Sequence, residues 1–142
     1  MITTAHLHPM TVHFPIAIIM VGFVFDFIYV FFRKDHCLSL MGHYLGVIGM
    51  AAAILAWGTG YFFTNPLAGE AEVVRSNHQL FATLTLVTII LTTLFRLVLD
   101  YLKKEGSWLK YVVILMYFMA FLFVSYTGYL GGKLVIEYLI GF

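Results

Sequence analysis

Long apolar runs separated by short polar stretches are the main pattern of this chain. A membrane-spanning helix needs about 20 mostly apolar residues, because its backbone must satisfy its own hydrogen bonds in lipid. Four segments meet this requirement, at about residues 14–32, 38–63, 78–102 and 108–130. The pattern predicts an all-α fold: residues 1–142 form a single transmembrane domain, an integral membrane four-helix bundle with a short C-terminal tail at 131–142.

Polar signals mark the ends of these runs. Arg33-Lys34-Asp35 follows the first run, and Asn65-Pro66, a helix-stopping pair, follows the second. Most connections are short, so we expect neighbouring helices to be antiparallel. The tail after the fourth run is too short to span again, and we expect it to turn at Gly131-Gly132 and lie along the bundle mouth.

Composition agrees with a membrane protein. The chain is 62% hydrophobic and 11% charged, whereas soluble domains are about 45–50% apolar and about 25% charged. The net charge of +1 gives no sign of a nucleic-acid partner. Cys37 is the only cysteine, which excludes an internal disulfide and a Cys-x-x-Cys-His site for covalent haem. The start lacks a basic region and a cleavage site, so we expect the first run to be retained as a span.

The basic residues are distributed unequally between the two faces of the membrane. We name the face at which the first helix begins side A, and the opposite face side B. Side A has Arg75 and Lys133, whereas side B has five basic residues, with Arg96 close to it: Arg33, Lys34, Lys103, Lys104 and Lys110. The positive-inside rule then predicts a multi-pass protein of the cell inner (plasma) membrane, with side B cytoplasmic and both termini extracytoplasmic.

Histidines gather on side A and supply the candidate chemistry. The first and third helices both begin there, so His13 and His78 are expected at similar depth. Neutral imidazole is a common metal ligand and an axial ligand of haem iron. We therefore predict one b-type haem with His13 and His78 as axial ligands. Arg75 or Lys133 would lie near the propionates, which need cations at the water boundary.

Two other interpretations of the same residues stay open. His8, His13 and His78, with Glu72 or Glu137, form an acceptable donor set for zinc or copper, although the spacing of His8 and His13 is not a standard ligand spacing. Alternatively, the protein is a purely structural membrane subunit in which these side chains only cap helices. In that case we expect Arg75 to make an ordinary ion pair with Glu72 or Glu70, which contributes little to stability if it is exposed.

Two charged residues lie well inside the predicted spans. Asp26 and Arg96 are at matching depth, near the side-B ends of the first and third helices. Ionisable groups in lipid normally pair or face the interior, so we predict an ion pair between them, with a proton path as the functional alternative. For His43, near side B, we favour a structural role.

The second helix has a face of small residues: Gly42, Gly46, Gly49, Ala53, Ala56 and Gly60. Small faces let membrane helices approach closely. This face either packs inside the bundle, leaves room for a flat macrocycle, or forms a homodimer contact.

The run His8–Ala17, with His78 and the segment Gly131–Val135, resembles a prokaryotic membrane family catalogued as domain of unknown function 2231. That family has a pattern like HPxxVHFPIA near its start and GGxLV near its end. The resemblance implies four transmembrane helices, and its motif histidines map here onto His8, His13 and His78. Some members are joined to cytochrome-c-like domains, which favours redox work.

The leading hypothesis is therefore a small membrane b-type cytochrome in the lipid bilayer. It would carry single electrons between a quinol or membrane dehydrogenase and a cytochrome-c-like acceptor, as an electron-transfer or oxidoreductase subunit.

Overall fold

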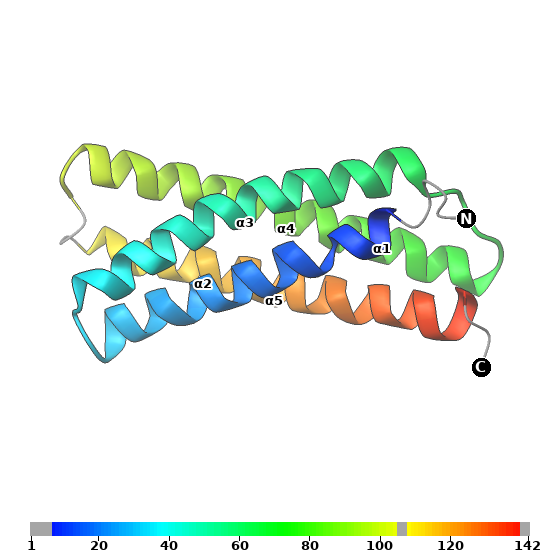
Figure 1. Ribbon diagram of the computed structural model, residues 1–142, viewed down its shortest axis with the longest axis horizontal. Helices are drawn as coiled ribbons and strands as arrows, with labels where there is room; N and C mark the ends of the chain where they lie inside the picture. The colour runs from blue at the N-terminus through cyan, green and yellow to red at the C-terminus, as the bar shows by residue number, and fades with distance from the viewer. Residues whose placement is uncertain (1–6, 105–107, 140–142) are drawn as a thin grey trace.

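The computed structural model describes residues 7–104 and 108–139. Four long helices make up the bundle: α2 (His13–Phe31), α3 (His36–Phe63), α4 (Glu70–Tyr101) and α5 (Leu109–Lys133). A short helix, α1 (Leu7–Thr11), precedes α2, and a π-helical segment, η2 (Leu134–Leu139), follows α5. The long helices run alternately up and down, and α1, η2 and the α3–α4 connection lie together at side A (Figure 1).

The outer surface of the bundle is as apolar as its interior. Leu55, Phe62 and Leu115 are more than half exposed. Each of the four long helices has the length and hydropathy to cross a membrane. The described residues contain no strand, so the prediction of an all-α four-helix membrane bundle is confirmed. The assignment of side A to the cell exterior stays a prediction.

The helix ends differ from the predicted ones at side A. α4 begins at Glu70 rather than near residue 78, because the acidic residues Glu70 and Glu72 in its first turn suit the positive end of the helix dipole. The Leu67 N–H also donates to Glu72 Oε2 at 2.8 Å, which caps this end. The expected turn at Gly131-Gly132 is wrong, since α5 continues through both glycines into η2.

The small-residue face of α3 is buried inside the bundle. Gly42, Gly46 and Gly49 are buried, as are Ala53 and Ala56 further along the same face. A Cβ at Gly49 would lie 2.9 Å from Ile19 Cγ1, so the close approach of α2 and α3 requires glycine there. This face therefore packs internally rather than between copies of the chain.

The middle of the bundle is an apolar core. Ile19, Ile89, Ala120 and Val124 are fully or almost fully buried there, from α2, α4 and α5. This core separates the histidines of side A from a group of charged residues nearer side B.

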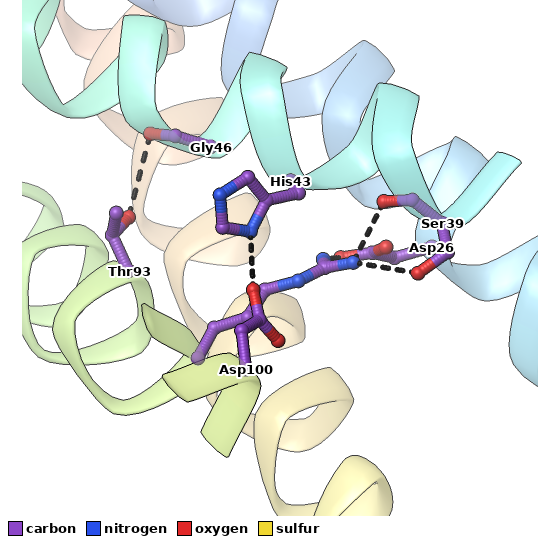
Figure 2. A network of polar contacts seen from close by, with 7 residues as sticks. Asp26, Ser39, His43, Gly46, Thr93 and Asp100 are labelled. Carbon is purple, nitrogen blue, oxygen red and sulfur yellow. Dashed lines mark hydrogen bonds and ion pairs between the residues drawn. The ribbon is translucent and has the colours of Figure 1, made fainter. Parts of the chain in front are cut away.

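The predicted pair of Asp26 and Arg96 is confirmed, because the Arg96 Nη1 donates to Asp26 Oδ2. His43 Nδ1 lies 2.9 Å from Asp100 Oδ2, in agreement with a structural role (Figure 2).

Candidate functional site

The first helix is interrupted once, and its first part, α1, lies against α3. Proline lacks an N–H, and its ring clashes with the carbonyl four residues earlier, which for Pro15 is that of Thr11. The α-helix is accordingly interrupted at residue 12, between α1 and α2. Thr11 Oγ1 lies 3.1 Å from Thr59 Oγ1 of α3, so a hydroxyl contact holds α1 against that helix.

His8 of α1 is fixed by α3. Its Nδ1 lies 3.1 Å from the Ala56 carbonyl oxygen and 3.1 Å from Thr59 Oγ1. A carbonyl oxygen only accepts hydrogen bonds, so Nδ1 of this imidazole carries the proton. The unprotonated nitrogen of neutral His8 is then Nε2, whose lone pair is free to bind a metal ion.

His78 of α4 is fixed in the same way by α5. Its Nδ1 lies 3.0 Å from the Thr127 carbonyl oxygen and therefore donates to it. Within the described residues, no hydrogen bond engages Nε2 of either His8 or His78. Metal-binding histidines commonly donate their other N–H to a backbone carbonyl, which fixes the tautomer and the ring direction.

The two imidazoles face each other at the side-A mouth of the bundle. Their ring centroids are 6.0 Å apart, and their planes are inclined at 80°. Both rings are half-buried. Since each is tied to a different helix through Nδ1, the bundle presents two preorganised nitrogen donors.

Two glycines make room for these rings. A Cβ at Gly60 would lie 2.8 Å from Cε1 of His8, and a Cβ at Gly131 would lie 3.2 Å from Cε1 of His78. The first separation is shorter than real Cβ contacts, and the second is tight. Each imidazole therefore lies against a helix backbone where a larger residue would displace it.

His13 has a different environment from His8. Its side chain is exposed, and its Nδ1 lies 3.1 Å from the Pro9 carbonyl oxygen, one turn earlier. The structure thus brings His8, rather than His13, to His78. His6, the remaining histidine of side A, lies outside the described residues.

The two cations predicted near the propionates are paired with carboxylates. Arg75 donates to Glu72 through Nε at 2.7 Å and through Nη2 at 2.6 Å. Lys133 Nζ lies 3.7 Å from Glu137 Oε2. The pair of Arg75 and Glu72 is the ion pair expected if the protein is a structural subunit. Arg75 lies one helical turn before His78.

The donor set at this site is a pair of imidazoles. Among the described residues, no group of three or more His, Cys, Asp or Glu side chains is placed to hold a metal ion. A structural zinc site takes four protein ligands and a catalytic one takes three. Two histidines are fewer protein ligands than either kind of zinc site takes, whereas haem iron takes one or two ligands from the protein.

Comparisons with known proteins agree with the architecture. A family model described as "Predicted membrane protein (DUF2231)" matches residues 4–142. No curated protein and no solved structure gave a significant match.

Proposed function

The chain belongs to the DUF2231 family of predicted membrane proteins, and we propose that it is a small membrane b-type cytochrome that carries single electrons. The observation that carries this proposal is the facing pair of His8 and His78, each with Nδ1 bound to a helix carbonyl and Nε2 unengaged. The proposal assigns the axial ligands to these two residues and leaves His13 as a helix-end histidine.

The spacing of the rings supports a shared metal ion. His8 and His78 would hold the iron of a bound haem through their unengaged Nε2 atoms. The ring centroids of His8 and His78 are 6.0 Å apart, which is close enough for both side chains to serve one cofactor. When bound, haem supplies the one-electron chemistry, and the protein supplies ligation, burial and the local electrostatic field.

The surrounding residues have distinct roles in this proposal. The carbonyls of Ala56 and Thr127 increase the donor strength of the two imidazoles by accepting their Nδ1 protons. Arg75 and Lys133 are the basic side chains of side A that would meet propionates, in exchange for their present carboxylate partners. A quinol or a membrane dehydrogenase is the proposed electron source, and a cytochrome-c-like protein is the proposed acceptor.

Absorption spectroscopy of the protein purified in detergent tests the proposal. With haem fully supplied, we expect a Soret band, and sharp α and β bands after reduction with dithionite. The variants His8→Ala and His78→Ala should each lose or alter these bands. His43→Ala, near side B, is the matched control and should retain them.

Three outcomes would contradict parts of the proposal. Absence of a Soret band after full haem supply would refute the cytochrome, and elemental analysis for zinc or copper would then test the alternative metal site. Loss of haem in His13→Ala but not in His8→Ala would show that His13, rather than His8, is the iron ligand. If neither haem nor metal binds, the histidines serve as interhelical hydrogen-bonding residues, and the protein is a structural subunit.

A further inference from the structure

The charged group near side B contains a carboxylate that is only partly satisfied. Asp26 is 3% exposed, and Arg96 donates to its Oδ2. Arg96 Nη2 also donates to the Ser39 carbonyl at 2.7 Å and to Ser39 Oγ at 3.1 Å, so the guanidinium is held by two helices (Figure 2). The other carboxylate oxygen, Asp26 Oδ1, has no hydrogen-bond partner in the described residues. A buried charged oxygen without a partner is costly.

A second unsatisfied polar atom lies one helical turn deeper in the bundle. Tyr117 is 1% exposed, and its hydroxyl has no partner among the described residues. The position of a Cβ at Gly22 would overlap this hydroxyl, and that of a Cβ at Gly42 would overlap the Asp26 carboxylate. Gly22 precedes Asp26 by one turn of α2, so both unpaired atoms lie where α2 packs against its neighbours. A buried water commonly bonds polar groups that have no protein partner, and these two atoms are such groups.

A pocket connects this carboxylate with side B. Its volume is ≈ 40 Å³, and a bound water needs about 10–15 Å³ on a comparable measure. The polar part of its lining comes from all four long helices: Asp26, Tyr29, Ser39, Arg96, Asp100 and Lys110. Asp100 and Lys110 are half-exposed near the side-B helix ends, so the pocket leads from the surface to the buried pair.

The path does not continue toward side A. Beyond Tyr117 the described interior holds apolar side chains of the core, among them Ile19, Ile89 and Val124. The threonines buried beside them, Thr85, Thr92, Thr93 and Thr127, donate their hydroxyl protons to backbone carbonyls. Access to Asp26 is therefore one-sided, and the arrangement is a half-channel rather than a pore.

We propose that this pocket is a proton-exchange site at which Asp26 takes up and releases a proton from side-B water. A proton delivered on a pocket water bonds to Asp26 Oδ1; the O–H bond of the hydronium breaks, and neutral water remains. Arg96 stays on Oδ2 throughout. The Tyr117 hydroxyl shares the innermost water with Oδ1 and ends the path.

The charges around Asp26 select a proton over a metal cation. Arg96 already neutralises the carboxylate, so a sodium or potassium ion would meet a site without net negative charge. The other titratable groups around the pocket are Tyr29, Asp100 and Lys110, with His43 paired to Asp100 and Tyr117 behind Asp26. The Asp100 carboxylate is placed to balance Arg96 when Asp26 is in its neutral form.

Infrared difference spectroscopy of the protein in liposomes tests this site. The readout is the carbonyl stretch of a protonated carboxylic acid after a change of external pH, with and without D₂O. We expect a pH-dependent band that shifts in D₂O and is lost in Asp26→Asn. The matched control Glu70→Gln, at the water end of α4, should retain it. Tyr117→Phe should change, by at least three-fold, the proton concentration at which this band is half-titrated.

Isotope labelling keeps the test valid if Asp26→Asn fails to fold. Carboxyl-¹³C aspartate should shift the band in the wild-type protein, which also separates it from haem propionates. The chain has only two other aspartates, Asp35 and Asp100, and neither is buried. The exposed Cys37 reports orientation, because a membrane-impermeant maleimide labels it only where side B faces outward.

In liposomes whose outer surface displays side B of the protein, the carboxylic-acid band should respond to external pH at least ten-fold faster than in liposomes that display side A. Equal response from both sides would refute the half-channel. A band that does not shift in D₂O would refute exchange with water. Absence of an aspartate band at every pH at which the protein stays folded would show that the pair is only a dry structural ion pair.

Discussion

Replacement of Arg96 by leucine is the most direct test of how the interior of this bundle is held together. The guanidinium makes three donor contacts, one to Asp26 and two to Ser39. Leucine fills part of the same volume but leaves the Asp26 carboxylate buried without a counter-charge. Breaking one partner of a buried ion pair typically costs about 3–5 kcal/mol. For a chain of this size that corresponds to a decrease of roughly 10–15 °C in Tm.

The double variant Asp26→Asn/Arg96→Leu separates loss of the pair from exposure of a bare charge. Removing both partners leaves a neutral amide in place of the carboxylate, so we expect stability to recover to within about 2 kcal/mol of the wild-type protein. Arg33→Leu, an exposed basic residue at the α2 end, is the control and should change stability by about 0.5 kcal/mol or less. Denaturation in detergent, followed by circular dichroism, gives these values. Unchanged stability of Arg96→Leu, or a double variant as unstable as the sum of the single ones, would refute the reasoning.

Three further outcomes follow from the packing and the topology. Gly42→Ala should destabilise the bundle by about 1–3 kcal/mol in the same denaturation assay, because the added Cβ overlaps the Asp26 carboxylate. The control Gly58→Ala, whose Cβ meets no atom within 4 Å, should be neutral or stabilising. Gly60→Ala should displace the His8 ring and lower haem occupancy, measured by the Soret absorbance per protein, by several-fold without unfolding the bundle; unchanged occupancy would argue against His8. An impermeant maleimide should label Cys37 in inverted vesicles and not in intact cells; the reverse would overturn the assigned orientation.

The sequence predicted the bundle because lipid imposes a simple rule on helix length and polarity. It also predicted the pair of Asp26 and Arg96, since two charges at equal depth in lipid have few alternatives to each other. The small face of α3 was recognised, but periodicity alone did not distinguish internal packing from a contact between copies of the chain.

The composition of the histidine site was not predictable in the same way. Depth along the membrane favoured His13 opposite His78, because His13 is nearer to the apolar run. Residues five apart on a helix lie on different faces, so His8 meets His78 while His13 is exposed. The receiving groups, the carbonyls of Ala56 and Thr127 and the bare backbone of Gly60, have no side-chain signal in the sequence.

The interruption between α1 and α2 also bears on the order in which the molecule is assembled. Because α1 is short and His8 and Thr11 make its polar contacts with α3, we expect it to open locally while α2 to α5 stay folded. The residue that completes the histidine pair is therefore expected to lie on a segment that opens more readily than the long helices. We expect its amide hydrogens to exchange faster than those of α2. In the proposed cytochrome, opening of α1 would separate His8 from His78, and docking of α1 would bring His8 back to the haem.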